Sequence, residues 1–201
     1  MSYKELKNNV LNYLEIKLSD IGFKKSKYVY LYEKDKNSIF VIGLNDSKQQ
    51  TKDRLFINPV MGLIVKPAEE LLFKLTGYDS LKNKISTISR PLGYLMPENT
   101  YKIWEFGNNL DNPRIIDHLF NTILNYGIPF IEKCTNYQYI INEFTTGKVG
   151  LPFEKDYKIP ILLFLNGQIN EAFQYIEMNK KKNIEFYLPY NEFANNFKSL
   201  N

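Results

Sequence analysis

The spacing of apolar residues changes twice along this chain, and these changes constrain its fold. From Tyr3 to Ile21 apolar side chains recur every three or four residues, which predicts an amphipathic helix ended by Gly22. From Phe23 the period becomes two, which predicts strands, and from Asn112 the helical period returns. Because the two periods occupy separate stretches, we expect an α+β fold. It would have an N-terminal helix, an antiparallel sheet of about four to five strands with helices packed on it, and an all-helical C-terminal part.

The strand region is predicted to contain a hairpin and further strands. The turn Asp35-Lys36-Asn37 separates two alternating stretches, and a polar loop precedes the next apolar run. In that run Asn58-Pro59 and Gly62 indicate a bulge or an edge, because proline cannot donate to a ladder. Apolar residues on both faces of the second and third strands predict a sheet covered on both sides, at least in part. The predicted strands are 23–33, 39–44, 55–65, 91–97 and 101–106.

Helices are predicted for most of the remaining chain. Pro67 suits the first position of a short helix that Gly77 ends, with Glu69 and Glu70 near its positive end. Ile128-Pro129 is expected to turn the chain. The predicted helical segments are 67–76, 81–88, 113–126 with Asn112 as its cap, one or two within 130–144, 159–165, 169–176 and 190–200.

Gly147, Gly150 and Pro152 form the most linker-like stretch of the sequence. They predict an α+β domain over residues 1–150 and a helical hairpin extension over residues 151–201, packed together as one structural unit. In the extension, residues 159–165 are apolar all round, which predicts a buried first helix before an amphipathic second one.

The residues that usually carry catalysis are sparse. His118, the single histidine, is expected to project into solvent from the polar face of its helix. Cys134 has no histidine near it in sequence, so the expected role is a small buried residue. Two acidic pairs are interpreted as helix-start acids and as linker polarity: Glu69 with Glu70, and Glu154 with Asp156. We therefore predict no enzyme, no metal and no cofactor, with a carboxylate-only hydrolase left open.

The charge is uneven along the chain. Positions 1–100 carry 16 basic and 11 acidic residues, against 10 and 11 in positions 101–201. Lysines outnumber arginines 23 to three, although phosphate and base recognition favour the arginine fork. We therefore interpret the lysines as a solvated surface and do not expect a nucleic-acid partner. Tight binding that weakens steeply with salt would revive that possibility.

The sequence carries no signal of membrane insertion or export. The longest apolar run, residues 159–165, is far shorter than the roughly 20 residues that span a bilayer. The first residues lack the apolar region of a signal peptide, and one cysteine cannot form an internal disulfide. We expect a cytoplasmic monomer or homodimer without a membrane partner.

Aromatic residues are unusually frequent, with 15 tyrosines and 14 phenylalanines. Tyrosine is favoured at protein interfaces because it offers a large contact area at low entropic cost. Tyr28, Tyr30 and Tyr32 alternate along one strand, so they either form an exposed recognition face or pack under a helix with their hydroxyls reaching water. The predicted partner-binding residues are Tyr28, Tyr30, Tyr32, Glu171, Tyr175 and Glu177.

Six segments carry a likeness to a known family: the N-terminal helix ending in Ile21-Gly22-Phe23-Lys24-Lys25, a following strand with aromatic residues, Phe56-Ile57-Asn58-Pro59, the strand around Trp104, Tyr126-Gly127-Ile128-Pro129-Phe130, and the stretch from Pro160-Ile161-Leu162-Leu163 through Gly167 to Ala172. Together they resemble the bacterial proteins of domain-of-unknown-function family 4304, some of which occur beside polymorphic toxins as immunity proteins. The resemblance implies that fold and that role, and it brings no active-site motif.

The leading hypothesis is therefore an immunity protein that binds a cognate bacterial toxin and neutralises it by occlusion, without catalysis. The toxin is expected from an adjacent gene. The alternative is a non-enzymatic protein-binding or scaffold module of another bacterial defence or regulatory system, with the C-terminal helical hairpin as its docking surface.

Overall fold

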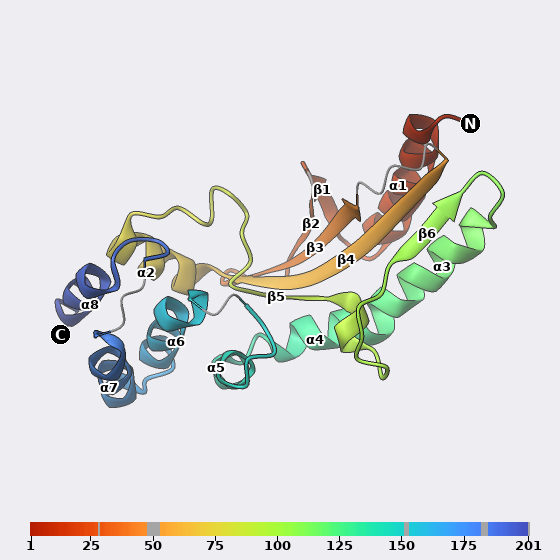
Figure 1. Cartoon of the computed structure of the whole chain (residues 1–201). Helices are drawn as coiled ribbons and strands as arrows, with labels where there is room; N and C mark the ends of the chain where they lie inside the picture. Colours follow the sequence, from red (N-terminus) through yellow and green to blue (C-terminus); the bar gives the residue numbers. More distant parts are fainter. Residues whose placement is uncertain (28, 48–52, 151–152, 182–184, 201) are drawn as a thin grey trace. The chain divides into compact units, whose positions relative to one another are not determined.

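The structure, a computed structural model, describes residues 1–27, 29–47, 53–150, 153–181 and 185–200 (Figure 1). Within these ranges the strands are β1 (Lys24–Ser26), β2 (Val29–Glu33), β3 (Ser38–Ser47), β4 (Arg54–Val65), β5 (Ile88–Pro91) and β6 (Trp104–Gly107). The helices are α1 (Tyr3–Asp20), α2 (Lys66–Thr76), α3 (Asn112–Thr122), α4 (Ile128–Lys133), α5 (Tyr137–Thr145), α6 (Glu154–Leu165), α7 (Ile169–Asn179) and α8 (Tyr190–Lys198). A 3₁₀ turn, η1 (Leu92–Leu95), and a π-helical segment, η2 (Ile123–Gly127), complete the order.

The fold class is α+β, as the sequence predicts. In the described residues the strands form one six-stranded sheet in the order β1-β2-β3-β4-β5, with β6 also paired to β4. The chain groups into two compact units. Unit 1 comprises Met1–Lys34, Phe40–Gly62 and Arg90–Glu132, and unit 2 comprises Asp35–Ile39, Leu63–Ser89 and Lys133–Asn201.

Helix α1 follows from its apolar stripe and its caps. Ser2 and Glu5 form a capping box, in which each side chain accepts a hydrogen bond from the other residue's backbone N–H. Beyond the C-terminus Gly22 has a φ of +91°, a left-handed conformation that glycine adopts without strain. The stripe of Leu6, Val10, Leu14 and Leu18 is buried, which confirms the predicted N-terminal helix.

The predicted strand over residues 23–33 is wrong, because the structure divides it into the hairpin β1–β2. Ser26 pairs with Val29, so only residues 27 and 28 lie between the strands. Lys27 has a φ of +55°, as tight two-residue hairpins require. A two-residue turn leaves the period-two alternation unbroken, and this one lacks the Asn-Gly signal that would have revealed it.

Strand β4 lies inside the sheet, so of the two predicted alternatives, a bulge or an edge, the edge is wrong. It is paired to β6 over Arg54–Ile57, and this pairing ends before Pro59. Pro59, which has no N–H to donate, therefore lies outside that ladder. Buried and partly exposed residues alternate as far as Val60, and only Met61–Val65 is buried throughout. Cover on both faces is thus confined to the end of the strand.

Four local predictions between residues 81 and 129 are also wrong. Residues 81–84 form turns, residues 85–87 are irregular and β5 begins at Ile88, so no helix occurs at 81–88. The predicted strand 91–97 is the 3₁₀ turn η1. Asp111, rather than Asn112, caps α3 by accepting a hydrogen bond from the Arg114 N–H. The helical path continues through η2 into α4, so Ile128-Pro129 does not turn the chain; Pro129 follows directly on the π-helical segment, where the usual pattern of helical hydrogen bonds is already altered.

Unit 2 contains the predicted helical hairpin of α6 and α7, followed by α8. Helix α6 is buried from Asp156 to Leu163, including Pro160. Aromatic rings join the three helices, with the ring centroid of Phe197 5.7 Å from that of Phe164 and 5.5 Å from that of Phe173. Among the described helices, none has both the length and the apolarity needed to cross a membrane.

Candidate functional site

An apolar pocket of about 210 Å³ opens beside Tyr32 in unit 1. The ring centroid of Tyr32 lies 5.6 Å from that of Phe23 and 5.8 Å from that of Phe40. Three aliphatic side chains complete the wall: Ile21, which follows α1, Leu124 of η2 and Ile128 of α4. The Tyr32 pocket is therefore lined by residues that lie far apart in sequence.

Two charged residues of the Tyr32 pocket form a weak ion pair at its rim. The Lys34 ammonium lies 3.7 Å from Glu132 and 5.7 Å from the ring centroid of Phe40. Both charged side chains are about half exposed, so water screens the pair and it adds little to folding stability. An apolar interior with a polar rim is the usual arrangement around an energetically important residue of a protein interface.

Local backbone features place these side chains. Gly22 turns the chain sharply between Ile21 and Phe23, and a Cβ at this position would lie 3.1 Å from the Tyr32 ring. The π-helical segment η2 adds one residue per turn, which alters the direction in which Leu124 projects. Leu124 keeps 36% of its surface exposed. A partner's side chain can therefore contact it without unfolding the unit.

The three predicted tyrosines do not form an exposed row. Tyr28 lies outside the described residues. Tyr30 is 3% exposed, and its buried hydroxyl has no hydrogen-bond partner among the described residues. Tyr32 is half-buried and forms a wall of the Tyr32 pocket.

The three predicted residues of α7 belong to unit 2 and differ in their surroundings. Glu171 is exposed. The Tyr175 hydroxyl donates to Asp156 Oδ1 at 2.9 Å, and burial together with this carboxylate raises the pKa of Tyr175. Glu177 forms ion pairs with Lys180 and Lys198. The structure thus divides the six predicted residues between the two units.

The Glu177 ion pairs lead to a pH prediction. Hydrogen bonds from Lys180 and then Lys198 lower the pKa of Glu177 to about 2. Because the pKa of Glu177 is lower in the folded chain than in the unfolded chain, its ionised carboxylate stabilises the fold at pH values above the unfolded-state pKa. This contribution is lost as the pH falls through about 2. We expect a carboxyl NMR titration midpoint near 2 for Glu177, moving upward in Lys180→Gln. An unchanged midpoint in that variant would show that the pair with Lys180 does not form in solution.

Glu69 lies in the first turn of α2, as predicted, but the interpretation of Glu154 as linker polarity is wrong, because Glu154 begins α6. Both carboxylates belong to a charged cluster in unit 2 whose centre is buried. Lys158 Nζ donates to the Thr87 carbonyl at 2.8 Å and to Glu154, and it lies 3.8 Å from Glu69 Oε1. The Ser80 hydroxyl donates to Glu69 Oε2. The available signal was Lys158 itself, a charged residue directly before the apolar run 159–165 and four residues after Glu154.

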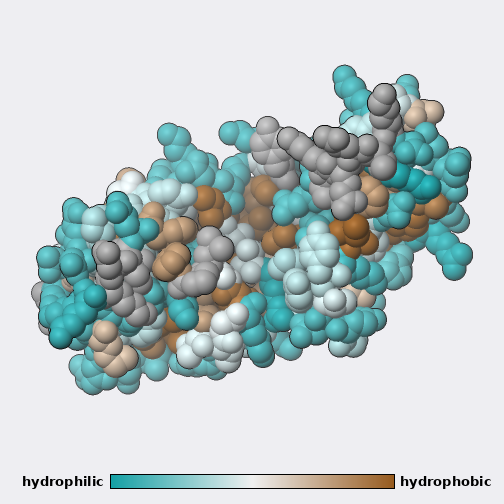
Figure 2. Space-filling model, in the orientation of Figure 1, coloured by the Kyte–Doolittle hydropathy of each residue, from teal (hydrophilic) through white to brown (hydrophobic). Residues whose placement is uncertain are grey.

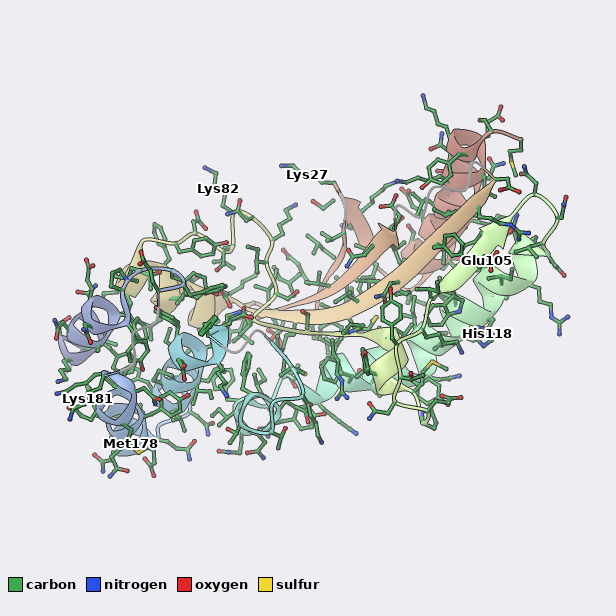
Figure 3. All side chains as sticks on the ribbon, viewed as in Figure 1. Lys27, Lys82, Glu105, His118, Met178 and Lys181 are labelled. Atoms are coloured by element: carbon green, nitrogen blue, oxygen red, sulfur yellow. The ribbon has the colours of Figure 1, made fainter. Side chains whose placement is uncertain are left out.

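The remaining candidates are accounted for by local contacts. His118 projects from α3 (Figure 3), is exposed as predicted, and its Nδ1 accepts a hydrogen bond from Trp104 Nε1 at 3.0 Å. Cys134 is buried as predicted, and burial followed by the nearby Glu143 charge raises the pKa of its thiol. In the described part of the chain, no group of three or more His, Cys, Asp or Glu residues is arranged to hold a metal.

Comparison with protein-family models, curated proteins and solved structures finds no match for this chain.

Proposed function

We propose that this chain is a non-catalytic protein-binding module, an immunity protein that neutralises a bacterial toxin by covering it. The Tyr32 pocket is the observation that carries the proposal. Its aromatic and aliphatic walls and charged rim suit one apolar side chain of a protein partner. The toxin-neutralising role itself comes from the family resemblance of the sequence, for which no family model gives a match.

The size of the pocket favours a side chain over a metabolite. Pockets for whole small molecules usually have volumes of about 300–1,000 Å³. The Tyr32 pocket, at about 210 Å³, is smaller. A single side chain fits, with the remainder of the contact formed by the surface around the rim.

The net charge of +4 limits the choice of partner. An inhibitor of a basic nuclease is expected to be acidic, because opposite charges accelerate encounter. Either the target is not such a nuclease, or it docks on the less basic C-terminal half, near Glu171, Glu177 and Glu192. Since Glu177 already pairs with two lysines, Glu171→Lys is the cleaner test of the second option. Unchanged affinity at low salt would exclude it.

The main prediction concerns Leu124→Glu, which places a charge at the mouth of the Tyr32 pocket. The toxin encoded by the adjacent gene should kill cells when expressed alone and should bind this chain with 1:1 stoichiometry. We expect Leu124→Glu to weaken that binding at least 30-fold by calorimetry, which corresponds to about 2 kcal/mol, and to abolish protection in co-expression.

Ile16→Glu is the matched control, because Ile16 is another exposed aliphatic residue of unit 1 and does not line the Tyr32 pocket. It should retain wild-type affinity and protection. Equal losses in both variants would remove the pocket from the interface. A neighbouring gene product that neither kills nor binds would contradict the immunity function itself.

One observation favours the alternative scaffold function. Met178 on α7 is 75% exposed and projects outward (Figure 3), and hydrophobic patches also lie among the hydrophilic residues in Figure 2. Deleting residues 157–201 cannot test this function, because it removes the buried helix α6 from the core of unit 2. Met178→Glu leaves that core intact. Loss of partner binding in Met178→Glu, with Leu124→Glu unaffected, would favour docking on the helical hairpin.

A further inference from the structure

A second pocket, of about 420 Å³, lies in unit 1 between α1 and the first four strands. We call it the Tyr30 pocket. It is twice the volume of the Tyr32 pocket and falls within the range of small-molecule sites. Leu11, Leu44, Leu55 and Ile57 supply its apolar surface. A ligand with an apolar body therefore fits this cavity.

Tyr30 contributes a polar group to this apolar surface. Burial, followed by the nearby Glu15 charge, raises the pKa of Tyr30 to about 12, so the hydroxyl remains protonated and able to donate. Its oxygen is buried and has no hydrogen-bond partner among the described residues. Leaving a buried hydroxyl unpaired is unfavourable, and a ligand acceptor inside the pocket would remove that cost.

The charges around the pocket favour an anion. Lys7 pairs with Asp46 at 2.5 Å, and Lys25 pairs with Glu15 at 2.6 Å. Lys27, at the tip of the β1–β2 hairpin, also lines the pocket, extends into solvent in Figure 3, and has no carboxylate partner among the described residues. Counting Glu15, which pairs with Lys25, the described surroundings carry three lysines against two carboxylates, so the excess positive charge is that of Lys27.

The hairpin register brings the donor and a cation together. Lys25 and Tyr30 are directly opposite each other in the β1–β2 ladder, so their side chains emerge on the same face. The Lys25–Glu15 pair and the Tyr30 hydroxyl therefore lie in one region of the pocket, as the influence of Glu15 on Tyr30 also indicates.

We propose that the Tyr30 pocket binds a small apolar monocarboxylate. Its hydrocarbon part packs on Leu55 and Ile57, and its carboxylate accepts hydrogen bonds from the Tyr30 hydroxyl and the Lys25 ammonium. Lys27 adds long-range attraction at the mouth. This ligand site is independent of the proposed toxin binding, which rests on a different pocket.

Decanoate, decanol and decyltrimethylammonium form a matched set of probes that differ in head group. In NMR titrations of the full chain we expect decanoate to bind at least tenfold more tightly than decanol. Decyltrimethylammonium should bind more weakly than decanol. Tyr30→Phe should weaken decanoate binding about tenfold, because it removes one hydrogen bond to a charged group. The same variant should weaken decanol binding less than decanoate binding, since the alcohol oxygen accepts only a neutral hydrogen bond and the apolar contacts are unchanged.

Lys27→Gly provides a second variant that the fold tolerates, because glycine suits the φ of +55°. It should weaken decanoate binding several-fold and reduce the salt dependence. Lys84→Gly is the control, because Lys84 has the same φ of +55°, lies in unit 2 and does not line the pocket. It should leave decanoate binding unchanged. Absence of decanoate binding, equal affinity for decanol, or unchanged decanoate affinity in Tyr30→Phe would each overturn the proposal. None of these outcomes affects the toxin-binding measurements.

Discussion

Replacing Lys158 by alanine is expected to lower the free energy of unfolding by about 3–5 kcal/mol, the usual cost of removing one partner from a buried ion pair. Lys158 is 2% exposed and Glu69 is 1% exposed. Glu69 Oε1 has no hydrogen-bond partner in the described residues, and the Lys158 ammonium 3.8 Å away is the charge that compensates it. Alanine would leave the Glu69 carboxylate buried and uncompensated.

Urea denaturation of Lys158→Ala, Glu69→Gln and the double variant tests this mechanism. Glu69→Gln removes the carboxylate that Lys158→Ala leaves uncompensated. The double variant should therefore lose less free energy of unfolding than the two single variants lose together, by at least about 1 kcal/mol. Lys180→Ala, which breaks an exposed pair with Glu177, should cost less than about 1 kcal/mol. Additive losses at Lys158 and Glu69 would mean that the two charges do not interact.

The parts of the fold that could be predicted are those specified locally. Helix α1 has a stripe and a capping box within its own sequence, and Gly77 ends α2 with a φ of +73°. The β1–β2 turn was missed because a two-residue turn preserves alternation. The π-helical segment η2 was missed because a single extra residue leaves the apolar spacing almost unchanged. The proposed domain boundary between residues 150 and 151 stays a prediction.

The candidate site depended more on long-range contacts. The sequence singled out Tyr32, but its pocket needs Leu124 and Ile128, which lie about 90 residues further along the chain. The carboxylates of the buried cluster lie as far apart, since Glu69 belongs to α2 and Glu154 to α6. No local pattern reports that two acids share one lysine. The sequence therefore indicates residue types, and the tertiary fold decides which of them meet.

Gly93→Ala is expected to lower the free energy of unfolding by about 3 kcal/mol, near the upper end of the usual cost of overpacking. A Cβ on Gly93 would lie 2.5 Å from the Thr100 carbonyl oxygen and 2.8 Å from the Lys102 backbone nitrogen. Both are backbone atoms, so no change of rotamer relieves the clash. Glycine is required here because two chain segments approach closely. Urea denaturation of the wild type and of Gly93→Ala measures the loss in the free energy of unfolding when a Cβ is added.

The same substitution connects the fold to the proposed interface. The turn η1, which contains Gly93, packs on η2, and η2 carries Leu124 of the Tyr32 pocket. Displacement of η1 should therefore also weaken toxin binding in molecules that remain folded. Gly43→Ala is the control: its added Cβ meets neighbours only at 3.8 Å or more, so stability should stay the same or rise by about 0.5 kcal/mol. If Gly93→Ala destabilises the chain while the affinity for toxin stays at the wild-type value, the position of η1 does not control the Tyr32 pocket, and the interface is independent of this contact.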